Sequence, residues 1–331
     1  MLSVLNQYDI FLVDAYGVFW DGANFIEGTK ETLKELVQKG KIVIILSNTT
    51  QRSAAAIEKY TKLGLVQGEH YHDLVTSGEV ARKILESGLV IEGKLLNKYY
   101  TFGTPNHTLF EGLHYQASSL EEAEFIYIGI PQFTKDQKEI LEEKYPLYES
   151  CLPKADQPPC WDTTEISAFS TIIEELSESS LPVLSANPDL MAPEKCKETH
   201  KTNFVIRQGY IAKALEEKKL KIRQFGKPYN EVYSFCRDLL TNVYAVPNLK
   251  NSKIVMIGDT VETDILGAHN ATLTLNWRVD SILTLTGNAV RALENMDNAA
   301  VTQHLKQQFQ EFKCEPTHII TSFGIKGSVF L

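Results

Sequence analysis

Two aspartates in one short motif are the residues whose types and spacing most directly suggest chemistry. Asp259 and Asp264 lie five residues apart and follow a buried-looking apolar run that ends at Gly258. Carboxylates in this arrangement can surround a hard divalent cation, and Mg²⁺ takes oxygen ligands in near-octahedral geometry. The motif therefore predicts a magnesium site.

Other polar residues stand where they could act on a phosphorylated ligand, although each also has a simpler interpretation. Asp14 could have a functional role or could cap a turn or a helix. Ser47, Asn48 and Thr49 could donate hydrogen bonds to phosphoryl oxygens or could cap the following helix. Lys227 could hold a carboxylate and a phosphoryl group together, or it could be a solvated surface charge.

Apolar runs predict the strands that would position these side chains. The runs at 10–13, 42–46 and 253–257 are continuous rather than alternating, which indicates strands covered on both faces. Amphipathic segments separate them, and this order predicts a parallel, doubly wound α/β sheet. Ligands of such sheets bind beyond the carboxyl ends of the strands. Candidate polar residues follow all three predicted strands.

Further elements are expected on both sides of these strands. Helices are predicted at 29–39, 53–63 and 298–311. Strands are predicted at 271–275 and 317–321, from short runs of apolar and β-branched residues.

The spacing of the motifs leaves room for a second domain at one place only. One helix fits between Asp14 and Ser47, whereas the stretch after Ser47 is long enough for a whole domain. We therefore predict a core formed by 1–79 and 223–331, with an inserted domain at 80–222.

Composition excludes several classes of protein. The 331 residues carry a net charge of -9, which argues against binding to nucleic acid or to an anionic membrane. No apolar run approaches the roughly 20 residues that span a bilayer, and the N-terminus lacks the basic region of a secretory signal. The five cysteines have no metal-ligand spacing. These features predict a cytoplasmic protein with reduced thiols.

Together the motifs resemble those of the haloacid dehalogenase (HAD) superfamily, and most closely its class IIA branch of NagD-like and pyridoxal phosphatases. The matching strings are DAYGVFWDG, ILSNTT, FGKPYNEVY and IGDTVETDILGA, with VTSGEVARKIL, SANPDL and GYIAKALEE as further matches. The resemblance extends over 8–90 and 181–287 and is weak over 131–180 and 288–331. It implies a Rossmann-like core with an inserted α/β cap domain.

The resemblance implies a phosphohydrolase that acts on a small phosphorylated metabolite. Asp14 would attack phosphorus and form an aspartyl-phosphate, which water then hydrolyses. Ser47, Asn48 and Thr49 would bind the phosphoryl group, and Lys227 would add positive charge beside Asp14.

The resemblance also implies that Mg²⁺ is the cofactor. Its implied ligands are the side chains of Asp14 and Asp259, the backbone carbonyl of Tyr16, and Asp264 as a ligand or an orienting group. The cation would neutralise charge between the Asp14 carboxylate and the phosphoryl oxygens.

Tyr16 departs from the family pattern. Phosphatases of the superfamily carry a second aspartate two residues after the nucleophile, and its side chain protonates the leaving group. A phenol has a reference pKa near 10, far from that of a carboxyl group, about 4. The sequence therefore predicts weak turnover or a substrate with a good leaving group, unless Asp21 substitutes as the acid.

The cap would set specificity and, as is common in class IIA, would form a homodimer interface. Asn187 and Asp189 correspond to the family's substrate-facing loop, although a simple turn with Asp189 capping a helix is equally consistent. Pyridoxal phosphatases place a histidine near the position of Ala192, so its absence argues against that substrate.

Two other functions stay open at this point. A HAD fold that has lost efficient catalysis and binds a phosphorylated ligand is suggested by Tyr16. A haloacid dehalogenase is suggested by the string DAYG. Dehalogenases of this type need no magnesium, however, and the retained pair Asp259 and Asp264 argues against that activity.

Overall fold

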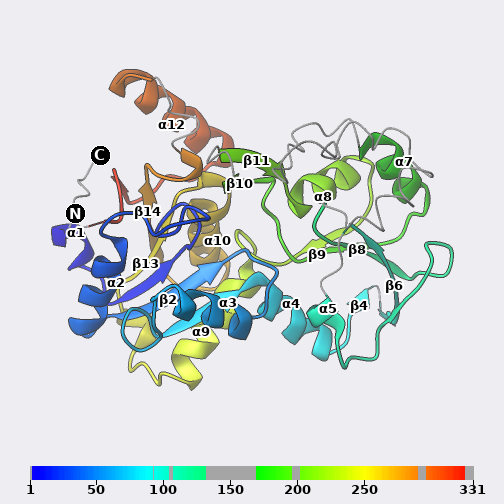
Figure 1. The fold of residues 1–331 in the computed structure, drawn as a ribbon, viewed down its shortest axis with the longest axis horizontal. Coiled ribbons are helices and arrows are strands. Elements are labelled where there is room, and N and C mark those ends of the chain that lie inside the picture. Colours follow the sequence, from blue (N-terminus) through cyan, green and yellow to red (C-terminus); the bar gives the residue numbers. More distant parts are fainter. Residues whose placement is uncertain are drawn as a thin grey trace. The chain divides into compact units, whose positions relative to one another are not determined.

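The computed structural model describes residues 2–91, 93–103, 107–131, 169–195, 202–289 and 296–324 (Figure 1). The chain divides into two compact units. The core unit comprises Met1–Ser47, Arg52–Thr76 and Gly226–Leu331. The cap unit comprises Asn48–Gln51 and Ser77–Phe225. The short loop 48–51 thus groups with the cap unit although it follows a core strand. Most of the segment 131–180 lies outside the described residues.

The core unit is built on a six-stranded parallel sheet with the order β15-β14-β13-β1-β2-β3. Its strands are β1 (Ile10–Val13), β2 (Ile42–Ser47), β3 (Asp73–Thr76), β13 (Ile254–Gly258), β14 (Val279–Thr284) and β15 (His318–Ile320). The prediction of a parallel, doubly wound sheet is confirmed. The order of the strands reverses between β1 and β13, and such a switch point is where open α/β sheets bind ligands.

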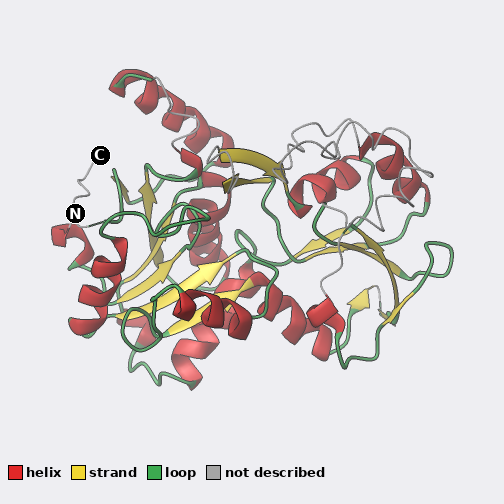
Figure 2. Ribbon diagram, in the orientation of Figure 1, coloured by secondary structure: helices red, strands yellow, loops and turns green. Residues whose placement is uncertain are grey.

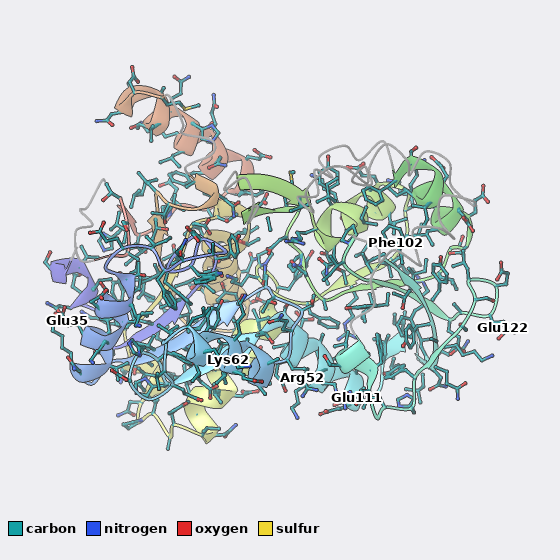
Figure 3. All side chains as sticks on the ribbon, in the orientation of Figure 1. Glu35, Arg52, Lys62, Phe102, Glu111 and Glu122 are labelled. Atoms are coloured by element: carbon teal, nitrogen blue, oxygen red, sulfur yellow. The ribbon has the colours of Figure 1, made fainter. Side chains whose placement is uncertain are left out.

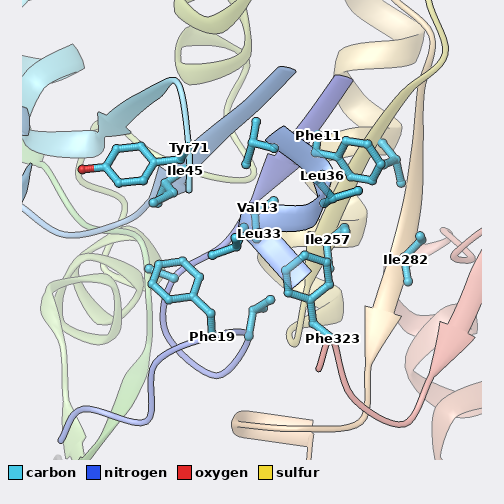
Figure 4. Packing of buried hydrophobic residues seen from close by; sticks show 14 of the residues in the cluster. Phe11, Val13, Phe19, Leu33, Leu36, Ile45, Tyr71, Ile257, Ile282 and Phe323 are labelled. Carbon is cyan, nitrogen blue, oxygen red and sulfur yellow. The ribbon is translucent and has the colours of Figure 1, made fainter. Parts of the chain in front are cut away.

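Burial on both faces of this sheet explains the continuous apolar runs. Every residue of β1 is buried, and successive side chains point to opposite faces because strands have a period of two. Phe11 and Val13 pack with Leu33 and Leu36 of α2 (Thr29–Gln38) in one hydrophobic cluster (Figure 4). The strand that ends at Asp14 is therefore fixed by packing on each side.

Helices connect the core strands, as the pattern predicted. They are α1 (Leu2–Leu5), α2, α3 (Ser53–Lys62), α9 (Asn230–Asn242), α10 (Leu266–Thr274) and α12 (Asn298–Phe312), with a 3₁₀ turn at Leu249–Asn251 and a π turn at Val261–Ile265. The predicted helices at 29–39, 53–63 and 298–311 are confirmed, and α2 is the one helix between β1 and β2.

The predicted strand at 271–275 is wrong. These residues lie at the end of α10, and the next strand begins only at Val279. Small residues explain the difference, because a Cβ built on Gly267 would lie 2.4 Å from the Tyr233 hydroxyl. Close packing of α10 against α9 therefore outweighs the β propensity of the alternating threonines and leucines.

The cap unit has its own parallel sheet, drawn in yellow in Figure 2. It has five strands in the order β12-β9-β8-β6-β7. These strands are β6 (Lys98–Phe102), β7 (Gln116–Ala117), β8 (Phe125–Ile128), β9 (Val183–Ser185) and β12 (Ile222–Gln224). Two antiparallel pairs accompany it: β4 (Val90–Ile91) with β5 (Lys94–Leu95), and β10 (Met191–Lys195) with β11 (Thr202–Ile206).

Helices cover both faces of the cap sheet. They are α4 (Ser77–Glu86), α5 (His107–Phe110), α7 (Ser170–Glu178) and α8 (Gln208–Glu217). Ile126 and Ile128 of β8 pack toward α7 and α8, whereas Phe125 and Tyr127 pack toward α4 and α5. In its described residues, the cap unit therefore has a hydrophobic core of its own, which fits an independent α/β domain.

Within the described part of the chain, no helix is both long and apolar enough to cross a membrane. Cys236 and Cys314 are buried free thiols, and the other cysteines lie outside the described residues.

Candidate active site

The end of β1 places a carboxylate beside a buried lysine. Asp14 follows Val13 directly, and its Oδ1 lies 2.5 Å from the Nζ of Lys227. The same Nζ lies 2.7 Å from Oδ1 of Asp264. Lys227 is only 2% exposed. The interpretation of Lys227 as a solvated surface charge is therefore excluded.

The end of β13 and the π turn after it place the second and third carboxylates. Asp259 directly follows β13, and Thr260 donates its backbone N–H to Oδ2 of Asp264 at 3.1 Å. This bond turns the Asp264 side chain back toward the strand end, where a Cβ built on Gly258 would meet it at 2.1 Å. Glycine at position 258 therefore makes room for the Asp264 carboxylate.

These three carboxylates fit a divalent cation. Oxygens of Asp14, Asp259 and Asp264 lie within 4.8 Å of one another, and all three residues are buried. Lys227 places one positive charge among these three carboxyl groups. Oxygen-only ligands, clustered and short of positive charge, are the donor set that Mg²⁺ prefers. The sequence-predicted acidic residues are thus brought together.

The raised pKa of Asp259 also fits a bound cation. Burial is the largest influence, and repulsion from Asp14 and Asp264 adds to it, so the pKa of the Asp259 carboxyl is raised well above its usual 3.8. A cation bound among these groups would oppose both effects and favour the ionised carboxyl.

This raised pKa predicts a metal-dependent pH profile of stability. Between 3.8 and the higher folded pKa, the folded chain holds a proton on Asp259 that the unfolded chain has lost. The free energy of unfolding of metal-free protein should therefore fall as pH rises through this window. Saturating Mg²⁺ should abolish the decline. Urea unfolding at several pH values, in EDTA and in Mg²⁺, measures this difference.

An Asp259→Asn variant is the control for that experiment, because it has no carboxyl to titrate at this position. The difference between wild type and variant isolates the contribution of Asp259 from that of other acids. Equal pH slopes for the two proteins in EDTA would contradict the assignment.

Lys227 is held in its charged form. Burial by itself lowers the pKa of Lys227, but attraction to Asp14 and Asp264 outweighs it and raises the pKa above the usual 10.5. The lysine therefore stays protonated and neutralises part of the carboxylate cluster.

Lys227→Met is expected to destabilise the metal-free protein by about 3–5 kcal/mol, because it leaves buried carboxylates without their cation. Urea unfolding measures the change, and Mg²⁺ should restore part of it. Lys62→Met is the control, since Lys62, labelled in Figure 3, is the last residue of α3 and forms an exposed ion pair with Glu58. A surface pair of this kind contributes about 0–1 kcal/mol. Equal stability of the two variants would contradict the role of Lys227.

The side chains of Tyr16 and Asp21 both form hydrogen bonds within the loop that follows β1. The Tyr16 hydroxyl donates to the backbone carbonyl of Asp21 at 3.2 Å and lies over Gly22, where a Cβ would come within 2.1 Å of it. Oδ1 of Asp21 accepts the backbone N–H groups of Ala23 and Asn24 at 2.8 and 2.6 Å. The Asp21 carboxylate thus stabilises a turn. This role argues against Asp21 as the general acid in place of the aspartate that Tyr16 replaces.

The remaining predicted residues fall in two places. Ser47 is buried at the carboxyl end of β2 in the core unit. Asn48 belongs to the cap unit and donates its Nδ2 to Oδ1 of Asp189 at 2.7 Å. Asn187 Oδ1 accepts the backbone N–H of Asp189 at 2.8 Å, which is a local turn as one interpretation predicted. Thr49 lies in the same cap-unit loop as Asn48.

Sequence reasoning missed a group of residues beside Asp259. The backbone N–H of Asn288 donates to Oδ2 of Asp259 at 2.6 Å, and Thr260 donates its hydroxyl to Oδ1 at 3.2 Å. The sequence signal for this group is the threonine-rich stretch at 284–288 with Gly287 near the end of β14.

Two stretches of the chain match known families. Residues 11–106 match the haloacid dehalogenase-like hydrolase family, and residues 224–323 match the HAD-hydrolase-like family. The two matches span Asp14, Lys227 and the acidic pair.

Whole-chain comparisons agree. The chain is 25% identical over 320 residues to phosphoglycolate phosphatase 1A, chloroplastic, of Arabidopsis thaliana, covering 94% of this chain and 78% of that protein. A possible sugar phosphatase of the HAD superfamily from Cytophaga hutchinsonii has the same fold, with a TM-score of 0.67, 21% identity, and coverage of 98% of this chain and 97% of that chain. A 4-nitrophenylphosphatase from Thermotoga maritima gives a TM-score of 0.57 at 20% identity, covering 97% of each chain. The chain therefore belongs to the haloacid dehalogenase-like hydrolases, in their class IIA branch of phosphatases.

Proposed function

We propose that this protein is a Mg²⁺-dependent phosphohydrolase that cleaves a small phosphorylated metabolite through an aspartyl-phosphate at Asp14. The observation that carries the proposal is the buried cluster at the switch point of the core sheet. There Asp14, Asp259 and Asp264 converge within 4.8 Å. Lys227 lies between Asp14 and Asp264.

Asp14 is the proposed nucleophile. A carboxylate oxygen of Asp14 forms a bond to phosphorus while the bond from phosphorus to the leaving oxygen breaks. Water then attacks the phosphorus of the aspartyl-phosphate, which frees inorganic phosphate and regenerates Asp14. Lys227 holds the Asp14 carboxylate in place through the 2.5 Å contact and adds positive charge where charge develops.

The proposed metal ligands are Asp14, Asp259 and the Tyr16 carbonyl, with Asp264 as a ligand or an orienting group. When bound, Mg²⁺ supplies positive charge between the nucleophilic carboxylate and the phosphoryl oxygens. Gly17 supports this arrangement, because its backbone lies so close to Asp259 that a Cβ would come within 2.1 Å of Oδ2.

Leaving-group chemistry sets the expected substrate. Tyr16 stands where superfamily phosphatases carry their acid, and its hydroxyl is bonded to the Asp21 carbonyl. The leaving oxygen must then take its proton from water. We therefore infer that turnover is slow for alkyl phosphates and faster for phosphate esters with good leaving groups.

Ser47, Asn48 and Thr49 are the proposed phosphoryl-binding residues, and Asn187 and Asp189 the proposed specificity residues of the cap. The relatives are named as phosphatases of phosphoglycolate and of 4-nitrophenyl phosphate, which supports a small phosphorylated substrate. A cytoplasmic location and a homodimer formed through the cap stay predictions from the sequence and the resemblance.

Asp189→Ala is expected to raise KM several-fold with little change in kcat on 4-nitrophenyl phosphate. The variant removes the acceptor that orients the Asn48 amide, and a lost ground-state contact appears in KM. Initial-rate kinetics measure the two constants. Asp73→Ala, at the start of β3, is a control that removes a carboxylate from a structural hydrogen bond with Tyr244. An unchanged KM in Asp189→Ala would overturn the role of Asp189.

The direct test of the proposed function is phosphate release from 4-nitrophenyl phosphate in EDTA and in Mg²⁺, with wild type and Asp259→Asn. This substrate has a good leaving group and needs little help from an acid. Turnover by wild type that requires Mg²⁺ and is lost in Asp259→Asn supports the proposal. Equal turnover in EDTA would contradict it.

A phospholigand-binding protein is the second candidate, and the Tyr16 side chain favours it. If the chain only binds, wild type should bind inorganic phosphate in the presence of Mg²⁺ yet turn over no phosphate ester.

The buried acidic cluster argues against dehalogenation, which needs no metal at this position.

A further inference from the structure

The segment Thr284–Asn288, at the end of β14 and just beyond it, lies against the carboxylate cluster although none of the sequence motifs includes it. Its sequence is Thr-Leu-Thr-Gly-Asn. β14 pairs with β13 in parallel, with Leu283 beside Gly258. The register therefore brings this segment to the same edge of the sheet as Asp259.

The segment bonds one oxygen of the Asp259 carboxylate directly and reaches the other through Thr260. The backbone N–H of Asn288 donates to Oδ2 at 2.6 Å. The Asn288 side chain donates to the Thr260 hydroxyl at 3.3 Å, and this hydroxyl in turn donates to Oδ1 at 3.2 Å. Since each oxygen accepts a hydrogen bond, the carboxylate is restrained in rotation.

The same segment also holds the loop that follows Asp14. The Thr286 hydroxyl donates to the backbone carbonyl of Gly17 at 2.5 Å. It lies 2.8 Å from the hydroxyl of Thr284, which contacts the carbonyl of Gly258 at 3.4 Å. One short segment thus links the backbone after β1 to the last residue of β13.

Gly287 makes this close approach sterically feasible. Its φ is +56°, and a Cβ built there would lie 2.2 Å from Oδ2 of Asp259 and 2.3 Å from the Cα of Gly17. Any side chain would therefore displace the carboxylate or the loop, so the contact is available only to glycine.

We propose that the 284–288 segment is a positioning element for the metal site, with Thr286 and Gly287 as its positioning residues. It fixes the Asp259 carboxylate and the Gly17 backbone relative to each other before a cation binds. This inference rests on the proposed function, because it concerns the same carboxylates. Outer partners of metal ligands typically contribute about 10–100-fold in metal affinity or activity.

The test measures binding of Mn²⁺ alone, by electron paramagnetic resonance of the free ion, without substrate. Thr286→Val keeps the shape but removes the hydroxyl, and it should weaken Mn²⁺ affinity about 10–100-fold. Thr286→Ser keeps the hydroxyl and should bind Mn²⁺ like wild type. Gly287→Ala should weaken binding at least as much as Thr286→Val, because it intrudes on Asp259. Saturating metal should restore most of kcat in Thr286→Val.

Thr272→Val is the matched control. The Thr272 hydroxyl contacts the backbone of Val279, at the opposite end of β14. Its loss should lower stability without changing Mn²⁺ affinity. Wild-type Mn²⁺ affinity in both Thr286→Val and Gly287→Ala would overturn the inference, while phosphatase turnover by wild type would leave the proposed function standing. Absence of Mn²⁺ binding by wild type would overturn both.

Discussion

Asp14→Asn is expected to reduce phosphate release by a factor on the order of 10⁴–10⁶, as the loss of other covalent nucleophiles does. The amide keeps the shape of the side chain beside Lys227 but cannot form an aspartyl-phosphate. Initial rates with 4-nitrophenyl phosphate at saturating Mg²⁺ measure the effect.

Asp9→Asn is the control for that variant. Asp9 lies on the same chain segment, just before β1, and its side chain accepts the backbone N–H of Lys253 at the surface. It should keep wild-type rates. Comparable rates in Asp14→Asn and wild type would mean that another group performs the chemistry.

Tyr16→Asp is expected to raise kcat/KM on alkyl phosphates by about 10²–10⁴-fold, the usual contribution of a general acid. The gain should be smaller for 4-nitrophenyl phosphate, whose leaving group needs no proton. A series of phosphate esters with different leaving-group pKa values measures the effect as a change of slope.

Two variants separate acid catalysis from packing. Tyr16→Phe removes the hydroxyl that donates to the Asp21 carbonyl and should leave the rate unchanged. Tyr16→Asn matches the size of aspartate without its proton and should give no gain. Equal gains in Tyr16→Asn and Tyr16→Asp would show that space, rather than the acid, was missing. Turnover found only in Tyr16→Asp would favour the phospholigand-binding alternative.

That Asp14 and Asp259 lie close together could be predicted from the sequence, because parallel strands end at one edge of a sheet. Asp14 and Asp259 each follow a continuous apolar run, and the structure pairs β1 with β13. Their convergence therefore follows from a local pattern and a general rule of topology. The position of Lys227 beside Asp14 was predicted from the family resemblance alone, because a lysine before a proline carries no local signal of burial.

Other features depend on contacts between distant residues, which a local pattern does not encode. The bond between Asn48 and Asp189 joins residues 141 positions apart. The bond between Thr286 and Gly17 spans 269 positions. The wrong prediction of a strand at 271–275 also reflects a distant contact. Gly267 of α10 packs closely on Tyr233 of α9, and this packing favours a helix there.

The covalent state of Asp14 during turnover is the most direct test of the proposed mechanism. Protein turning over 4-nitrophenyl phosphate with Mg²⁺ would be quenched in acid, digested and mapped by mass spectrometry. We expect a phosphoryl group on the peptide that contains Asp14, lost on treatment with hydroxylamine and absent when Mg²⁺ is withheld. Rapid turnover with no phosphoryl group on that peptide at any quench time would contradict a covalent mechanism at Asp14.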